Sequence, residues 1–196
     1  MTFVEILPLA KDVSLTLAPL FASGIAWFGL STWKRQSRGV ASYEVARGIL
    51  LMSYILADRI KMFRSPLLSL SAEGVKENGQ IVEEMKQYDD REERLATDFL
   101  NFKTKIQEGK ALWGDLVMPD YNIIDMAIRE LRAGVWEHFW IKGGHATPGA
   151  TVDDSPERVT KNNLLIYETG GRDPFSHKVN EAFTRLDKIL ARKMRR

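Results

Sequence analysis

The chain has 196 residues, of which 44% are hydrophobic and 28% charged, and it contains no cysteine. Its formal net charge of +2 is too small to indicate a nucleic-acid-binding protein, and the absence of cysteine excludes a thiol nucleophile. What remains informative is the distribution of the hydrophobic residues along the chain.

The first predicted element is the uncharged stretch 13–33, which lies between Asp12 and Lys34. At about 1.5 Å per residue, a helix of this length spans roughly 30 Å, the thickness of the bilayer hydrocarbon. A buried helix of a soluble domain is the first alternative, but the serines and threonines here do not line up on one face. A cleaved signal peptide is the second, but the stretch ends in Trp33-Lys34-Arg35 rather than at a small-residue cleavage site. The sequence therefore predicts an uncleaved transmembrane helix.

The residues around the end of this stretch predict its orientation. Aromatic and basic residues suit the membrane interface, and here they are Trp27, Trp33, Lys34, Arg35 and Arg38. Positive charge following a span favours the cytoplasmic side. We therefore expect residues 1–12 to form a short extracytoplasmic N-terminus and residues 34–196 to form a cytoplasmic domain. The chain would then be a single-pass protein of a bacterial inner membrane.

Small residues recur on one face of the predicted span. They are Ala18, Ala22, Ala26 and Gly29. Such a strip lets two helices approach closely in lipid, although small residues are also common in spans without such a role. A homo-oligomer formed through the span is one hypothesis.

Helical periodicity continues in residues 42–64, where apolar residues recur every three or four positions. They are Val45, Ile49, Met52, Leu56, Ile60 and Phe63. Ser65-Pro66 ends this helix, because the residue before proline avoids the helical region. A polar connection is expected from about Ser69 to Gly79.

The longest predicted helix runs from Gln80 to about Trp113. One apolar seam follows it, interrupted by Glu92 and Gly109. The seam residues are Ile81, Met85, Tyr88, Leu95, Phe99, Phe102, Ile106 and Trp113. The bulky aromatics favour an arm of an antiparallel bundle over a parallel two-stranded coiled coil.

Two further helices are predicted. One spans Asp120 to Ile141, and its inward residues are Ile124, Ile128, Leu131, Val135 and Phe139. Residues 143–156 are turn formers and predict a mobile loop, and a short apolar patch follows at 164–167. Asp173-Pro174 predicts the start of the last helix, whose inward residues are Val179, Phe183, Leu186 and Leu190. The expected fold is all-α, with the transmembrane helix followed by a bundle of about four helices.

Several short motifs together resemble a known group of proteins. They are Trp33-Lys34-Arg35-Gln36, Phe63-Arg64-Ser65-Pro66, Ala111-Leu112-Trp113-Gly114 and Asp173-Pro174-Phe175. With them the chain resembles a widespread group of uncharacterised bacterial single-span membrane proteins with a cytoplasmic helical domain. The resemblance supports the topology and implies no catalytic residue.

The sequence offers little for catalysis. His138, His145 and His177 lack metal-ligand spacing and are interpreted as surface or capping histidines. A metal could be held only if side chains near the 143–156 loop converged; these are Glu137, His138, His145, Asp153 and Asp154. The glycine spacing of 144–149 lacks the lysine of a phosphate loop. Trp113, Trp136 and Trp140 are interpreted as core or interface residues rather than a platform for bases. No catalytic, cofactor-binding or metal-binding residue is predicted.

Three functions follow as hypotheses. The first is a membrane-tethered, non-enzymatic interaction module that holds a cytoplasmic protein partner at the inner membrane. The second is a membrane-acting effector of a bacterial stress or phage-defence system, motivated by the small-residue strip. The third is an enzyme whose site lies in the 143–156 loop. The lipid bilayer is a partner in the first two, and nucleic acid is not expected.

Overall fold

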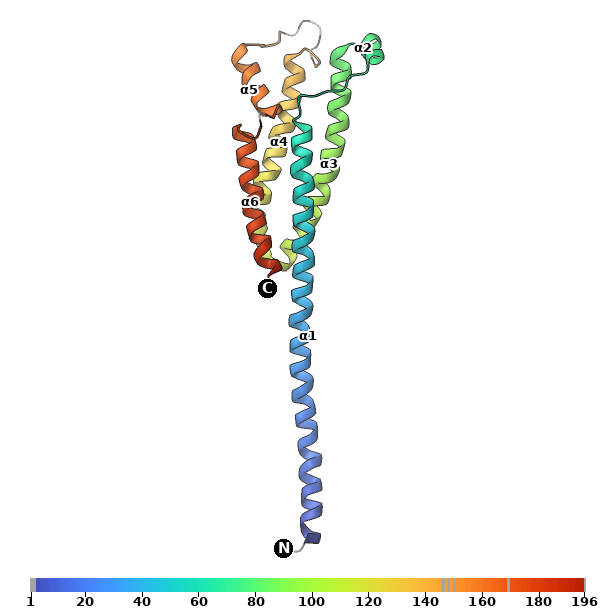
Figure 1. Ribbon diagram of the computed structural model, residues 1–196, viewed down its shortest axis with the longest axis vertical. Coiled ribbons are helices and arrows are strands. Elements are labelled where there is room, and N and C mark those ends of the chain that lie inside the picture. The colour runs from blue at the N-terminus through green and yellow to red at the C-terminus, as the bar shows by residue number, and fades with distance from the viewer. Residues whose placement is uncertain (1–2, 146, 148, 150, 169, 196) are drawn as a thin grey trace. The chain divides into compact units, whose positions relative to one another are not determined.

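The structure, a computed structural model, describes residues 3–145, 147, 149, 151–168 and 170–195, with side chains from Ala26 onward. No residue in these ranges belongs to a β-strand, and the elements are helices (Figure 1), which confirms the predicted all-α fold. The chain divides into two compact units, Met1–Tyr43 and Glu44–Arg196. The second is called the helical domain below.

Helix α1 (Phe3–Phe63) is continuous. The sequence predicted separate helices over 13–33 and 42–64, and the segment between them is helical as well. It contains no proline, and one glycine, Gly39, costs only about 1 kcal/mol in a helix interior. Among the residues whose side chains the structure describes, Ala26–Phe63 is the one helical stretch that is long and apolar enough to be a candidate membrane span.

The part of α1 that belongs to the helical domain has the character of a core helix. Ala46, Ile49, Leu56, Ile60 and Phe63 are buried there, at the predicted three-and-four spacing. Charged residues such as Arg47, Asp58 and Lys61 occupy its exposed face. Packing within the domain therefore explains the buried apolar residues of this part of α1, whereas Leu51, Tyr54, Ile55 and Met62 are exposed. The uncharged residues before Lys34 stay the predicted span.

The connection predicted over Ser69–Gly79 is wrong in part, because it contains the short helix α2 (Ala72–Asn78). Ser71 caps this helix by accepting a hydrogen bond from the Gly74 amide at 3.1 Å. Helix α3 (Gln80–Trp113) has the predicted bounds. Its seam is buried at Tyr88, Leu95, Phe102 and Ile106, whereas Ile81 at the start is 36% exposed.

The second half of the domain contains a 3-10 turn, η1 (Gly114–Val117), and the helices α4 (Met118–Ile141), α5 (Pro156–Ile166) and α6 (Pro174–Met194). Helix α5 was predicted only as an apolar patch at 164–167; its N-terminal half is polar, so periodicity did not indicate it. Asp173 caps α6 as predicted, by accepting a hydrogen bond from the Ser176 amide. Among the predicted inward residues, Val135 and Phe183 are only half-buried.

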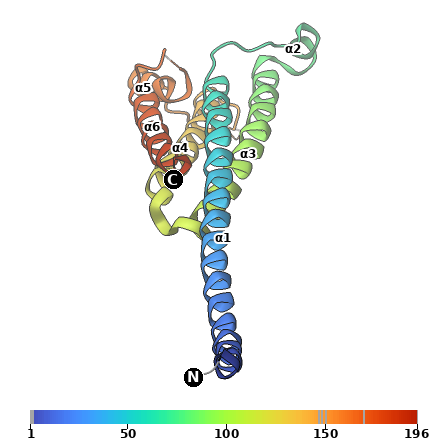
Figure 2. The same cartoon turned by 60° about the horizontal axis from the view of Figure 1, so that its bottom comes forward.

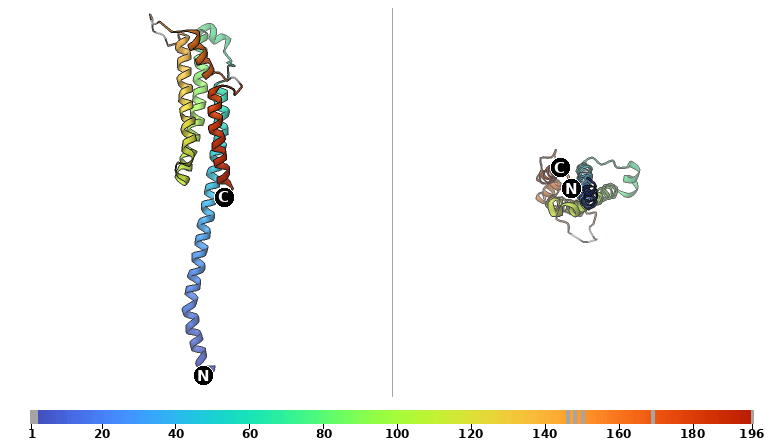
Figure 3. Two further views of the ribbon diagram at one scale, coloured as in Figure 1. Left: turned by 90° about the vertical axis from the view of Figure 1, so that its left-hand side faces the viewer. Right: turned by 90° about the horizontal axis from the view of Figure 1, so that it is seen from below.

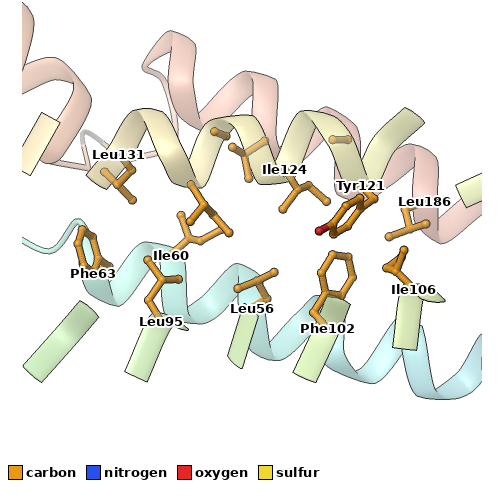
Figure 4. Close-up of a cluster of buried hydrophobic side chains, with 14 of the residues drawn as sticks. Leu56, Ile60, Phe63, Leu95, Phe102, Ile106, Tyr121, Ile124, Leu131 and Leu186 are labelled. Carbon is orange, nitrogen blue, oxygen red and sulfur yellow. The ribbon is translucent and has the colours of Figure 1, made fainter. Parts of the chain in front are cut away.

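Within the helical domain, the Glu44–Phe63 part of α1 lies beside α3, α4 and α6, and successive long helices run in opposite directions (Figures 1, 2 and 3). Their buried side chains meet along one interior, which Figure 4 shows in close-up. Phe63 and Leu56 come from α1, Phe102 from α3, Tyr121 from α4 and Leu186 from α6. Each large side chain buried in this way contributes roughly 1.5–3 kcal/mol of hydrophobic free energy.

Helices α4 and α5 approach each other closely at Gly134. A Cβ atom on Gly134 would lie 2.6 Å from Leu165 Cδ2 and 3.2 Å from Ile166 Cγ2. Asn162 of α5 donates a hydrogen bond to the Gly134 carbonyl at 2.8 Å. A side chain at this position would therefore force the side chains of Leu165 and Ile166 to move.

We predict that Gly134→Val lowers the free energy of unfolding by about 1–3 kcal/mol, because overpacking forces neighbouring side chains to move. Intrinsic helix propensity favours valine over glycine, so a loss must come from packing. Urea denaturation followed by far-UV CD measures it. Ala133→Val, at the exposed neighbouring position, is the control and should cost less than about 1 kcal/mol. Equal losses in both variants would contradict the close approach.

Candidate binding cleft

The end of α1 is fixed by a buried arginine. Arg64 is 1% exposed and its guanidinium donates five hydrogen bonds to the stretch from the last turn of α5 to the first turn of α6. The acceptors are the carbonyl oxygens of Leu164, Leu165 and Tyr167, Oδ1 of Asp173 and Oγ of Ser176. The Arg64 carbonyl in turn accepts from the Glu168 amide at 2.9 Å. Two motifs about a hundred residues apart, Phe63-Arg64-Ser65-Pro66 and Asp173-Pro174-Phe175, are thereby in contact.

Both side chains of the Arg64–Asp173 ion pair are buried, and Arg64 Nη2 lies 3.0 Å from Asp173 Oδ1. Burial alone would raise the pKa of Asp173, but hydrogen bonds from the amide and hydroxyl of Ser176 and from Arg64 lower it to about 2. The Arg64 guanidinium also lies 4.5 Å from the centre of the Phe175 ring. Such a fully bonded pair fixes local geometry rather than offering a reactive group.

A second arginine holds the chain directly after α1. Arg91 of α3 donates to the carbonyls of Phe63 at 3.1 Å, Ser65 at 2.7 Å and Leu67. These carbonyls lie at and beyond the end of α1, where no helical partner is available. The two arginines together fix the position of Phe63.

The cleft lies between α3 and α4, next to Phe63, and has a volume of about 300 Å³. Phe63 and Phe139 contact the buried Tyr88 edge-on, with ring centres 5.9 and 5.5 Å from that of Tyr88. Met85 and Val135 extend the apolar lining. A cleft with an apolar lining and a few polar groups is the usual form of a binding site.

Three charged residues lie at the same cleft. Glu92 Oε1 is 2.6 Å from Arg132 Nε, and Asp89 also lines the cleft. Burial raises the pKa of Glu92 above its usual value, an effect that Arg132 opposes and Asp89 increases. The cleft therefore combines an apolar lining with one more carboxylate than it has guanidinium groups.

An aromatic stack forms one side of the cleft. Trp136 is 55% exposed and lies between Trp140, with ring centres 5.5 Å apart, and His145, with ring centres 5.6 Å apart. The interplanar angles are 17° and 13°. A half-exposed tryptophan fixed by stacking is the kind of residue that dominates protein–protein interfaces. Of the two interpretations of Trp136, core or interface, exposure argues against the first, and the second stays a prediction.

The interpretation of His138 as a surface or capping residue is wrong, because it is 6% exposed. Burial, together with the nearby charge of Lys142, lowers its pKa to about 4, while Glu84 opposes the shift. Lys142 itself pairs with the buried Glu84 at 2.5 Å. His138 is therefore neutral at pH 7, with its Nε2 3.5 Å from the Tyr167 hydroxyl. His177, by contrast, is exposed as expected.

The side chains proposed around the 143–156 loop do not form a metal site within the part of the chain that the structure describes. Glu137 Oε1 instead accepts a hydrogen bond from Arg158 Nε at 2.8 Å, and Asp153 Oδ2 lies 3.5 Å from the same guanidinium. The Arg158 guanidinium therefore occupies the position beside these two carboxylates that a metal ion would need.

The predicted span residues belong to the first unit. Side chains of Ala18 and Ala22 lie outside the described residues. Ala26 is exposed, and a Cβ on Gly29 would meet nothing within 4 Å. Trp27 and Trp33 are largely exposed, as are Lys34, Arg35 and Arg38. The packing face and the interface assignment stay predictions.

Sequence reasoning missed Arg64, Arg91 and the cleft. Two signals were available in the sequence. The motifs that carry the resemblance contain Arg64 and Asp173, and Glu92 interrupts the apolar seam of 80–113. Spacing along a chain does not say which distant segments meet. No protein-family model matches the chain, and neither a curated protein nor a solved structure shows significant similarity to it.

The pKa of His138 in the folded chain lies below its unfolded value of 6.5. The stability contributed by the neutral imidazole is therefore fully present above pH 6.5 and is lost as the pH falls towards 4. We predict that this histidine alone lowers the free energy of unfolding by about 2 kcal/mol when the pH falls from 7 to 5. Urea denaturation at the two pH values measures the loss, which should be that much smaller in His138→Leu. His177→Gln, which alters an exposed histidine, should behave like the wild type. An unchanged pH response in His138→Leu would contradict a buried neutral imidazole.

Proposed function

We propose that the chain is a membrane-tethered, non-enzymatic interaction module that holds a cytoplasmic protein partner at the bacterial inner membrane. The carrying observation is the combination, in one chain, of an uncharged anchor candidate and a helical domain with an apolar cleft beside a half-exposed tryptophan.

The membrane part of the proposal is supported by the first half of α1. Residues 3–43 are helical, and the large apolar side chains described there, including Trp27, Phe28 and Trp33, are exposed. Exposed aromatics next to Lys34, Arg35 and Arg38 suit a membrane interface. The basic residues after the span favour a cytoplasmic location for the helical domain.

The partner part of the proposal is supported by the cleft. Its apolar lining and the stacked Trp136 offer an anchor position, and the surplus carboxylate favours a basic residue on the partner. The polar groups described at the cleft include no nucleophile activated by a neighbouring base. Binding a protein segment is therefore the activity that this geometry supports best.

The topology is tested with fusions after Arg196 in a bacterial host. We expect fluorescence from a fluorescent protein and no activity from alkaline phosphatase, and we expect both fusions to remain with the membranes after carbonate washing. Replacing residues 13–33 by a charged linker should release the chain into the soluble fraction. Active phosphatase would place the domain outside, and a soluble wild-type chain would remove the anchor.

Partner binding is tested by cross-linking in cells, with Trp136→Asp as the variant. If Trp136 is the anchor of the interface, the cross-linked species should fall by roughly tenfold or more, since such positions contribute about 2 kcal/mol or more. Met126→Asp is the matched control, because Met126 is also exposed on α4 but does not line the cleft. Equal amounts of the cross-linked species from the wild type and from Trp136→Asp would contradict the proposed interface.

A further inference from the structure

A second cavity in the helical domain is lined by arginines. It has a volume of about 270 Å³, lies between the end of α1 and α3, and is also lined by Phe63. Arg59, Arg91 and Arg94 all line it, and no carboxylate is among the described residues that do. Except for Phe63, the residues lining it are different from those of the cleft.

The three guanidinium groups differ in how far they are already bonded. Arg59 Nε pairs with Asp98 at 2.5 Å, so its charge is compensated while its terminal nitrogens remain donors. Within the part of the chain that the structure describes, the hydrogen bonds of Arg91 go to neutral carbonyl oxygens, which leave its charge uncompensated. Arg94 is exposed and makes no hydrogen bond or ion pair with another described residue. The cavity therefore carries a formal charge of about +2.

This charge and these donors fit one ligand chemistry best. A phosphate monoester carries about −1.5 to −2 at pH 7 and has three acceptor oxygens, whereas one carboxylate would leave half the charge unmatched. Guanidinium groups bind phosphate oxygens with two parallel hydrogen bonds. Apolar side chains also line the cavity, since Met62 and Leu67 are both largely exposed there. They would contact the organic part of an ester.

We propose that the cavity lined by Arg59, Arg91 and Arg94 binds a phosphate monoester, with Arg94 as the principal free donor and Met62 and Leu67 in contact with the ester group. The phosphate belongs either to a soluble compound or to a lipid headgroup. The site is independent of the cleft and of the partner proposed for it.

The test uses the full-length chain in phosphatidylcholine nanodiscs, titrated by calorimetry with inorganic phosphate and with phenyl phosphate at constant ionic strength. Both should bind saturably, and phenyl phosphate should bind more tightly because its ring contacts the apolar side chains. Binding should weaken several-fold from pH 8 to pH 5, since the monoester loses its second charge near pH 6. Nanodiscs that also contain phosphatidic acid separate the two sources. A lipid headgroup in the site would weaken phenyl phosphate binding by competition, and a soluble ligand would leave it unchanged.

The Arg94→Gln variant should bind phenyl phosphate at least about tenfold more weakly, and Arg94→Lys should lie between it and the wild type. Arg94 is exposed, so neither change should alter the far-UV CD spectrum or the unfolding midpoint. Lys103→Gln, which removes one exposed charge from the same helix, should leave binding within about twofold. The proposal is overturned if the wild type shows no saturable binding, or if Arg94→Gln and Lys103→Gln bind equally.

Discussion

A guanidinium group enclosed in a protein interior needs an acceptor for nearly every N–H, because each unmade hydrogen bond to a buried charge is costly. Arg64 meets this requirement with five hydrogen bonds, and all of the acceptors lie in the stretch from the end of α5 to the first turn of α6. The geometry of the second half of the helical domain therefore depends on the last turn of α1, although a hundred residues separate them in sequence.

The same constraint shapes both cavities of the domain. Phe63 precedes Arg64 and lines both the cleft and the arginine-lined cavity. Its position is fixed because Arg64 is bonded to the α5–α6 segment and Arg91 is bonded to the carbonyls after α1. The two candidate ligand sites thus have a common rigid wall. The proposed functions depend on that wall, since a cleft or cavity is selective only if its lining is held in place.

Much of the fold was predictable because its signals are local. The bounds of α3 and the start of α6 follow from the apolar seam and from the Asp173-Pro174 cap, both of which are short-range patterns. Helices α2 and α5 were missed since each is short and mostly polar. The continuity of α1 was missed because the stretch 13–33 and the periodicity of 42–64 were interpreted as separate helices, although the charged residues between them do not end a helix. The cleft, Arg64 and the burial of His138 depend on contacts between distant segments, which spacing alone does not reveal.

The central claim is that the buried Arg64 organises the helical domain, and the free energy of unfolding of Arg64→Met tests it most directly. Urea denaturation of this variant should show a loss of about 3–5 kcal/mol, because the buried Asp173 carboxylate would lose its cation. The comparison is Arg47→Met, which changes an exposed arginine of α1 and should cost less than about 0.5 kcal/mol. A loss in Arg64→Met as small as that in Arg47→Met would contradict the account.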